Sequence, residues 1–364
     1  YQKYMSNFDG LLNEVKRGIE GRSKWIPLYH TKLSQHIGIG KRIYTVIGGS
    51  SGVSKTSFLD WTYILCPYNW ILNNETDIKI KIIYRSMERS KIYKLAKWTC
   101  LKLYIKYGFL IDVPTLLGWG NKKNNVSQEL YDNIIECKEY FDKMLDVVEI
   151  IDGPVNPTGI YNKITETALQ DGKIIDISKY EKRYIPNDPN LITLHITDHI
   201  GKLKGERREN TFLTDKGLLD KHSEYMTIAR DFYGWTPIDV CQFNRGIEST
   251  YRAVKTDLTP QPSDFKGTGN VYENCDIALA LFNPYKLKIM DHMGYKIEKF
   301  VDSRGYNRFR SVICLKNSYG IDDFRVGLQF IGENGYIMEL PTAKELKDSD
   351  YEDIVKGGQT KLIF

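Results

Sequence analysis

The stretch that decides the fold is Ile43–Phe58, which reads IYTVIGGSSGVSKTSF. It begins with an apolar, β-branched run, continues through a loop of glycine and serine, and passes Lys55 and Thr56 into a segment compatible with a helix. This order is what a phosphate-binding loop requires, because backbone N–H groups at the helix start and the lysine ammonium then face an anion. We predict a nucleotide-binding loop made of Gly49, Ser50, Ser51, Gly52, Val53, Ser54, Lys55, Thr56 and Ser57.

One position of this loop departs from the phosphate-loop pattern. The motif has glycine immediately before the lysine, whereas this chain has Ser54. A Cβ there obliges the loop to open slightly or to shift its φ, and Gly52 can supply the lost freedom. The competing interpretation is a solvated strand-to-helix turn that happens to contain Lys-Thr. We expect nucleotide to bind, even if weakly.

Bulk composition indicates a soluble globular protein. Of the 364 residues, 41% are hydrophobic and 27% are charged, which is ordinary for a chain that can bury a sizeable core. The net charge of +5 permits contact with nucleic acid without indicating it. The N-terminus lacks the apolar centre of a signal peptide, and no apolar run reaches membrane-spanning length. We expect a cytoplasmic protein (host cytoplasm if viral) without membrane contact.

The cysteines and histidines do not form a zinc-binding pattern. The six cysteines are far apart, without a Cys-x-x-Cys pair, and neither they nor the six histidines have zinc-ligand spacing. Several cysteines lie in apolar or helical runs, so we expect reduced thiols that are buried as small hydrophobes. His195, inside a predicted strand, is interpreted as a core histidine, and His199 lacks a partner at metal-ligand spacing.

Hydrophobic periodicity predicts alternating strands and helices in the first half of the chain and mostly strands in the last third. The fold class is therefore α/β, a mostly parallel twisted sheet flanked by helices, with antiparallel strands added at its C-terminal edge. After the loop, strands are predicted at 78–84, 147–151, 191–197, 238–243, 277–282, 296–301, 311–315, 326–331 and 336–340. Helices are predicted after Phe58, from Ser90 to Ile105, from Ser127 to Leu145, from Thr158 to Ala168 and from Glu224 to Tyr233.

Residues 41–340 form the predicted domain, and three segments lie outside its sheet. Apolar residues at helical spacing within residues 1–40 predict a helical arm that packs on the domain or on a neighbouring subunit. Residues 171–190 fit neither a helix nor a core strand and are interpreted as a surface insertion. Residues 341–364 form a polar, acidic tail that is predicted to be peripheral.

Polar residues follow the predicted strands at the sheet edge where ligands of open α/β folds bind. Asp198 can hold Mg²⁺ opposite the Thr56 hydroxyl, or it is a helix cap or turn carboxylate. Glu88 can orient the attacking water as a base, or it is a first-turn glutamate favoured by the helix dipole. Gln242 can hydrogen-bond a γ-phosphate, or it ends a solvated strand. Each signal is weak alone, and their common placement carries the prediction.

These blocks, in this order, resemble the RecA-like ATPase (motor) domain of DnaB-type replicative helicases, in its phage-like form. Gly49–Thr56 stands at the Walker A position, and Ser86-Met-Glu88 resembles the family's Ser-Leu-Glu. Asp198-His-Ile-Gly-Lys-Leu203 stands where the family has Asp-Tyr-Leu-Gln-Leu. Two further blocks are more specific: Gln242-Phe-Asn-Arg-Gly-Ile-Glu248 resembles Gln-Leu-Asn-Arg-x-x-Glu, and SDFKGTGNVYENCD at 263–276 resembles SDLRESGSIEQDAD.

The resemblance covers residues 8–340 and implies a ring, usually a hexamer, that binds ATP and Mg²⁺ between subunits. It implies a helicase motor that hydrolyses ATP and translocates on single-stranded DNA during DNA replication, with a primase or a loader as a partner. Glu88 is then the catalytic carboxylate, Gln242 reports the γ-phosphate, and Lys316 completes a neighbour's site. The family has a separate N-terminal domain; we expect either that it lies outside this chain or that this is a stand-alone motor domain.

One departure concerns the turn that enters the neighbouring site. The family has Lys-x-Arg-x-Gly, whereas Lys316-Asn-Ser318-Tyr-Gly320 has serine at the arginine position. An arginine finger contributes orders of magnitude in rate. Either Arg308 or Arg310 replaces it from the adjacent segment, or hydrolysis is slow.

Two loops after the catalytic strands carry basic residues that suit a sequence-independent, salt-sensitive contact with a nucleic-acid backbone. The family places its pore loops here, and the alternative is a solvated surface. The candidates are Lys202, Lys204, Arg207 and Arg208 in the first loop and Arg252, Lys255 and Lys266 in the second.

Two other functions fit the same residues. A RecA-like ATPase of recombination or packaging turns over ATP without unwinding DNA. A catalytically weakened nucleotide-binding assembly protein would account for Ser54 and Ser318, although the intact Lys55, Thr56 and Glu88 argue against complete loss of catalysis.

Overall fold

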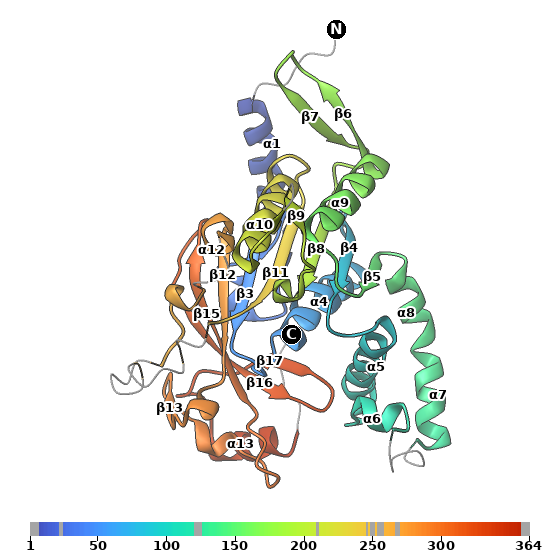
Figure 1. Ribbon diagram of the computed structural model, residues 1–364. Coiled ribbons are helices and arrows are strands. Elements are labelled where there is room, and N and C mark those ends of the chain that lie inside the picture. The colour runs from blue at the N-terminus through green and yellow to red at the C-terminus, as the bar shows by residue number, and fades with distance from the viewer. Residues whose placement is uncertain are drawn as a thin grey trace.

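A single nine-stranded sheet forms the centre of the computed structural model, which describes residues 7–21, 25–119, 126–208, 211–244, 247, 252, 258–265 and 270–357. Its strand order is β17-β16-β15-β12-β3-β11-β8-β4-β5 (Figure 1). The six strands from β12 to β5 run parallel, and β15, β16 and β17 extend one edge antiparallel, as predicted. The strands are β3 (Thr45–Gly49), β4 (Lys79–Ser86), β5 (Val148–Asp152), β8 (Leu191–Asp198), β11 (Thr236–Gln242), β12 (Ile277–Phe282), β15 (Phe309–Asn317), β16 (Arg325–Ile331) and β17 (Tyr336–Glu339).

Helices cover both faces of this sheet. Successive residues of a strand point to opposite faces, so that Ile47 of β3 joins one apolar cluster and Val46 joins the other. The first cluster is covered by α3 (Lys55–Leu59), the π-helical turn Asp60–Leu65, α4 (Cys66–Asn73), α5 (Lys91–Tyr107), α7 (Gln128–Glu136) and α8 (Lys138–Leu145). The second is covered by α9 (Pro157–Asp171), α10 (Asp215–Asp231) and α12 (Val271–Asn274). Shorter helices are α2 (Thr31–Ser34) and α6 (Val113–Leu116).

Capping side chains fix several helix starts where the sequence predicts them. The Ser90 hydroxyl accepts a hydrogen bond from the Tyr93 N–H, and the Ser127 hydroxyl accepts one from the Leu130 N–H. The helix predicted from Ser127 is interrupted at Cys137, where α7 ends and α8 begins. All six cysteines are free and buried, which confirms the prediction of reduced thiols in the core.

Three predicted elements differ from the structure. Residues 296–301 are not a strand: after the short strands β13 (Asp291–His292) and β14 (Tyr295–Lys296), Ile297–Phe300 forms a 3-10 helix. The helix predicted at 224–233 begins earlier, at Asp215, because Thr214 caps it. The predicted tail is not wholly peripheral, because it contains α13 (Asp348–Val355). Its Tyr351 ring packs on Phe300, with ring centroids 4.8 Å apart.

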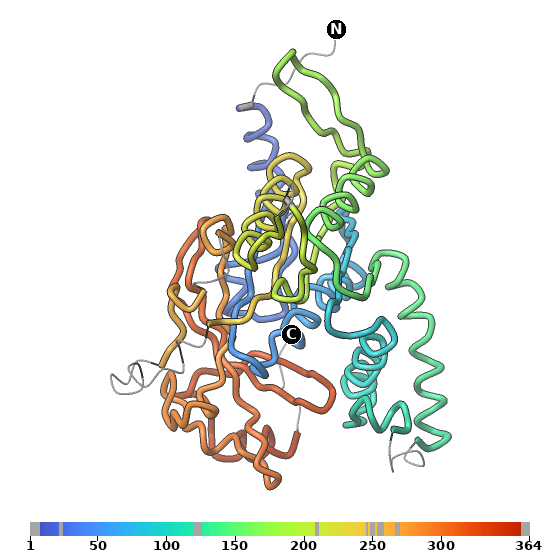
Figure 2. The backbone as a smooth tube through the Cα atoms, in the orientation of Figure 1, coloured from blue at the N-terminus to red at the C-terminus, as the bar shows by residue number. Residues whose placement is uncertain are grey.

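The predicted insertion 171–190 forms an antiparallel hairpin of β6 (Gly172–Asp176) and β7 (Lys182–Pro186). It extends from the same end of the molecule as α1 (Asn7–Ile19) (Figures 1 and 2). The apolar side chains of α1 do not pack on the domain within one chain, since Phe8 and Ile19 are 66% and 82% exposed. The remaining short strands are β1 (Ile26–Pro27) paired with β2 (Gly38–Ile39), and β9 (Arg207–Arg208) paired with β10 (Thr211–Phe212).

Within the described residues, no helix combines the length and apolar character needed to cross a bilayer. The core instead contains buried polar groups on the α9–α10 face of the sheet. His222 contacts the Asp239 carboxylate at 2.9 Å, and the Tyr44 hydroxyl donates to the same carboxylate at 2.7 Å. His195 is fully buried on the neighbouring strand, as predicted for a core histidine, and both of its ring nitrogens lack a hydrogen-bond partner among the described residues.

Buried histidines make the stability of this fold depend on pH. Burial lowers the pKa of His195 to about 3, and burial lowers the pKa of His30, which stacks on Phe58 next to the loop helix, to about 3 as well. Both values lie below the pKa of 6.5 in an unfolded chain, so the unfolded state binds more protons at intermediate pH. The stabilisation is complete above pH ~6.5 and is lost as the pH falls towards ~3.

We therefore expect His30→Gln to flatten the pH dependence of stability. Between pH 5 and 6, each such histidine removes about 1.4 kcal/mol of unfolding free energy per pH unit. Denaturant titrations at several pH values should show a slope smaller by about that amount in the variant than in the wild type. Equal slopes in the two proteins would contradict a neutral, buried His30.

Candidate functional site

The predicted phosphate loop joins the central strand β3 to a helix that continues from Lys55 through a π-helical turn to Asn73. Ser54 stands at the N-cap with φ 78°, the left-handed conformation that glycine adopts without strain. The loop thus keeps the backbone shape of the usual motif although its residue has a Cβ. Gly49 needs to be glycine for a different reason, because an added Cβ would lie 2.8 Å from the Leu281 carbonyl oxygen.

Lysines surround this loop. The Lys55 ammonium donates to the carbonyl oxygens of Gly49 and Ser50 at 2.7 and 2.8 Å, and burial lowers its pKa. Lys286 donates to the Ser51 carbonyl oxygen at 3.0 Å. The loop therefore offers positive charge and small side chains, which is what an anion of phosphate size requires.

The carboxylate of Asp198 faces this loop from the end of β8. Thr56 Oγ1 lies 3.3 Å from Asp198 Oδ1. Neighbouring oxygen ligands of an octahedral Mg²⁺ are about 3 Å apart, so the two groups fit one ion, directly or through water. Among the described residues, no three acidic, histidine or cysteine side chains form a metal-binding group. This donor set suits Mg²⁺ that also binds substrate phosphates, rather than a metal held by protein alone.

Asp198 is held by a buried network that the sequence did not suggest. Its Oδ2 accepts from the Tyr84 hydroxyl at 3.0 Å and lies 3.4 Å from the Lys94 ammonium. Lys94 is 1% exposed and also contacts Asp60 at 3.2 Å, while burial raises the pKa of Asp60. A buried charge needs such a partner, because an unpaired one in this environment costs several kcal/mol. Lys94 and Tyr84 therefore fix the orientation of the Asp198 carboxylate.

A cavity of about 370 Å³ opens between the loop and these strand ends. Its volume lies at the lower end of the range for small-molecule sites. The predicted residues Lys55, Thr56, Glu88, Asp198 and Gln242 all line it, so the structure brings them together. The wall also includes Ser51, Gly52, Ser54, Ser57, Asp60, Arg89, Tyr93, Lys94, Lys97, His199 and Val240.

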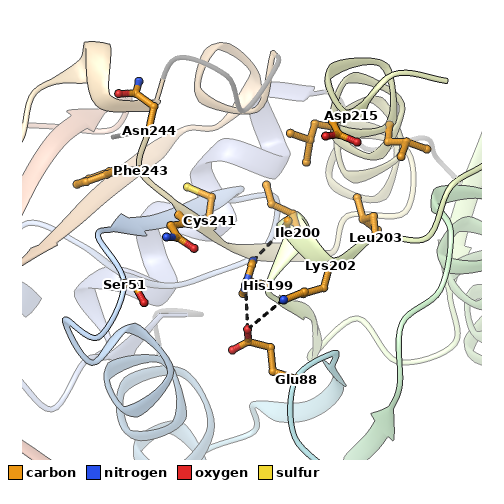
Figure 3. A pocket seen from close by; sticks show the side chains of 14 residues that line it. Ser51, Glu88, His199, Ile200, Lys202, Leu203, Asp215, Cys241, Phe243 and Asn244 are labelled. Atoms are coloured by element: carbon orange, nitrogen blue, oxygen red, sulfur yellow. Dashed lines mark hydrogen bonds and ion pairs between the residues drawn. The ribbon is translucent and has the colours of Figure 1, made fainter. Parts of the chain in front are cut away.

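Glu88 lies on the rim that this cavity shares with a second one of about 560 Å³. Figure 3 shows the second cavity, with the Glu88 carboxylate facing His199 and Lys202. His199 Nε2 lies 3.1 Å from Glu88 Oε1, and the Lys202 ammonium lies 4.0 Å from the same oxygen. Glu88 is thus a hydrogen-bond partner of His199, and this contact was not predicted from the sequence.

The predicted nucleic-acid residues divide into two groups. Lys202, Lys204 and Arg207 are exposed after β8, and the Arg207 guanidinium stacks 4.6 Å from the Phe212 ring centroid. Arg252 instead forms a largely buried ion pair with Asp264 and donates to a backbone carbonyl, so it is not placed to contact DNA in this conformation. Lys255, Lys266 and the side chain of Arg208 lie outside the described residues.

The two arginines considered as replacements for the finger are not free to reach a neighbouring subunit. Arg308 is 2% exposed and pairs with Asp302 and Glu333. Arg310 is 7% exposed and donates to Ser54 Oγ of its own loop at 3.3 Å, so neither arginine replaces a finger in this conformation. Lys316 is half-buried and donates to the Glu273 carbonyl oxygen at 2.8 Å, away from its own cavity.

Arg310, one of the two arginines considered as a replacement for the finger, contacts the phosphate loop of its own chain. Its guanidinium donates hydrogen bonds to the Ser54 hydroxyl and to the carbonyl oxygens of Asn307 and Phe309, all of which are uncharged. It also stacks 4.7 Å from the Phe330 ring centroid. Burial, together with the nearby Arg308 cation, lowers the pKa of Arg310 to about 9. An arginine this buried without a carboxylate adds to the positive field behind the loop.

Comparisons with known proteins agree with this geometry. No family model matches the chain, and no curated protein matches it by sequence. Among solved structures it is similar to the ATPase domain of G40P, at 17% identity and a TM-score of 0.64, over 93% of this chain and 100% of that one. It is also similar to a DnaB-like replicative helicase solved to show its interactions with primase, at 15% identity and a TM-score of 0.62, over 93% of this chain and 68% of that one. The chain has the RecA-like fold of DnaB-type helicase ATPase domains.

Proposed function

We propose that this chain is the motor of an ATP-dependent DNA helicase, which hydrolyses ATP with Mg²⁺ and moves on single-stranded DNA during replication. The observation that carries the proposal is the meeting of Lys55, Thr56, Glu88, Asp198 and Gln242 in one cavity of a DnaB-like fold. Phosphoryl transfer to water needs these groups: a cradle, a metal held by hydroxyl and carboxylate, a base and a γ-phosphate contact.

Each residue has a role in this reaction that follows from its place. Lys55 neutralises the β- and γ-phosphates, and Thr56 and Asp198 would hold Mg²⁺, which neutralises charge on the leaving group. Glu88 takes a proton from the attacking water. The water oxygen then bonds to the γ-phosphorus, and the bond between that phosphorus and the β–γ bridging oxygen breaks. Gln242, beside Gly49 in the register of β11 on β3, hydrogen-bonds the γ-phosphate.

We propose a homo-oligomeric ring, a hexamer, as the working state. The apolar face of α1, exposed in a single chain, supports this because such a face is usually covered by a partner. In the ring, Lys316 would contact a neighbour's nucleotide, and Lys202, Lys204 and Arg207 would face single-stranded DNA in the pore.

Primase or a loader is the expected partner. The domain, residues 41–340, and the cytoplasm as its location remain part of the proposal.

A second function, a nucleotide-binding assembly protein with slow hydrolysis, is favoured by Ser318 and by the burial of Arg308 and Arg310. A RecA-like ATPase that turns over ATP without unwinding is the third candidate. ATP turnover and its response to DNA separate these functions.

ATPase assays with and without single-stranded DNA test the proposed function in wild type, Lys55→Ala and Glu88→Gln. Wild type should hydrolyse ATP faster with DNA. Lys55→Ala should lose nucleotide binding. Glu88→Gln should still bind a fluorescent ATP analogue but hydrolyse ATP at least about 100-fold more slowly than wild type, since a general base contributes that much. Glu129→Gln, at an exposed position on α7, is the matched control.

Sizing of the same samples completes this test. No DNA-stimulated turnover in the wild type would contradict the motor and favour the assembly protein. Stimulated turnover by a protein that stays monomeric would favour the third candidate.

Two substitutions of Ser54 test whether this residue is strained in a loop that keeps its phosphate-binding conformation. Ser54→Gly and Ser54→Ala both remove the hydroxyl that Arg310 contacts, but only alanine keeps a Cβ at φ 78°. Ser54→Gly should be more stable to unfolding than Ser54→Ala by roughly 1–2 kcal/mol, the cost of a side chain in the left-handed region. Equal stability of the two variants in denaturant titrations would show that the loop does not hold this conformation.

A further inference from the structure

Glu88 connects the two cavities of this molecule. The phosphate-side cavity and the larger cavity beside it share Ser51, Glu88, His199 and Gln242 in their walls. The larger cavity extends to Lys202 and Leu203, at the start of the exposed basic segment after β8. A change at that basic segment can therefore reach the proposed general base through direct contacts.

The proton position on His199 follows from its two hydrogen bonds. Nδ1 accepts a hydrogen bond from the Gly201 N–H at 3.1 Å, so Nδ1 has no proton. Nε2 then has the proton in the neutral ring and donates it to Glu88 Oε1 at 3.1 Å. The ring is held in place, since the His199 side chain is 12% exposed, whereas that of Glu88 is 43% exposed. His199 is therefore the more buried partner and Glu88 the more exposed one.

Lys202 contacts the same carboxylate oxygen from the exposed side. Its ammonium lies 4.0 Å from Glu88 Oε1, and its side chain is 52% exposed. A 3-10 turn, Ile200–Lys202, joins it to His199, and the Lys202 N–H donates to the His199 carbonyl oxygen at 3.0 Å. An ion pair this exposed is weak, so another anion can readily displace the Glu88 carboxylate from Lys202. A DNA phosphate near Lys202 is such an anion.

We propose that His199 and Lys202 restrain Glu88 in the absence of DNA, and that a DNA phosphate that binds Lys202 releases it to act on water. The proposal rests on the proposed motor function. A carboxylate that accepts an N–H and faces an ammonium is not free to turn towards an attacking water. His199 and Lys202 are positioning residues, because neither touches the reacting atoms. The arrangement would make hydrolysis depend on occupancy of the DNA site within a single subunit.

The test measures kcat and KM for ATP without DNA and at saturating single-stranded DNA. His199→Phe keeps a ring but removes the donor, so DNA-independent kcat should rise roughly tenfold, the factor expected for a hydrogen bond to a charged group. KM for ATP should stay unchanged, and the ratio of stimulated to unstimulated kcat should fall by the same factor. His199→Gln, which can still donate to Glu88, should keep the wild-type ratio.

Lys202→Gln replaces the ammonium with a neutral amide on a shorter side chain and is a surface change that leaves folding intact. It should also raise DNA-independent kcat and lower the stimulation ratio, with a weaker dependence of DNA affinity on salt. Matched controls are His36→Phe, whose ring packs on Phe324 far from the cavity, and Lys216→Gln, an exposed lysine beside Asp215 on the cavity wall. Both controls should keep the wild-type ratio.

The outcomes separate this inference from the function on which it rests. If wild type is not stimulated by DNA, the motor function itself is wrong. If wild type is stimulated but His199→Phe and Lys202→Gln keep its ratio, only the restraint is wrong. A fall of kcat in His199→Phe by the same factor with and without DNA would also overturn it, because His199 would then support Glu88 in catalysis.

Discussion

The parallel pairing of β3 with its neighbours is the constraint on which the site depends. Parallel strands end at the same edge of a sheet, so the loop after β3 and the residues after β4, β8 and β11 meet there. The register makes this specific: Gln242 is opposite Gly49, and Ser86 is opposite Asp198. A shift by one residue would turn each of these side chains to the other face. The apolar residues that fix the register thus also fix the distances within the site.

Buried charge is the second constraint, and it has a cost. Lys94, Asp60 and Asp198 lie in the core beside the cavity, where transfer of a charge out of water costs several kcal/mol that a partner only offsets. Apolar residues would stabilise the fold at least as well at these positions. The network therefore makes sense as a way to hold the Asp198 carboxylate in one orientation, opposite the Thr56 hydroxyl. These buried charges lower the stability of the fold but hold the Asp198 carboxylate in place.

Sequence patterns predicted the sheet, the loop and the polar strand ends, because each depends on residues close together in the chain. They failed where distant residues decide the outcome. A lysine at position 94 of an amphipathic helix gives no sign that Asp60 and Asp198 are its partners. The 3-10 helix at 297–300 forms because Ile297 and Phe300 are both fully buried there, which a run of alternating residues does not reveal. Arg310 was one of two candidates for a neighbour's site, and only the position of β15 shows that it contacts its own loop.

Positive charge near the phosphate loop comes from this chain itself, which bears on the serine, Ser318, that replaces the family's arginine. Lys55 and Lys286 contact the loop backbone, and Arg310 contacts the Ser54 side chain. All three belong to the same chain, so the field on a bound phosphate is built largely within one subunit. Electrostatic stabilisation of this kind acts through fixed, desolvated charges, and the burial of Lys55 and Arg310 provides them. The proposed motor would need less from a neighbour to neutralise charge, and control over Glu88 within the subunit would then be a natural place for regulation by DNA.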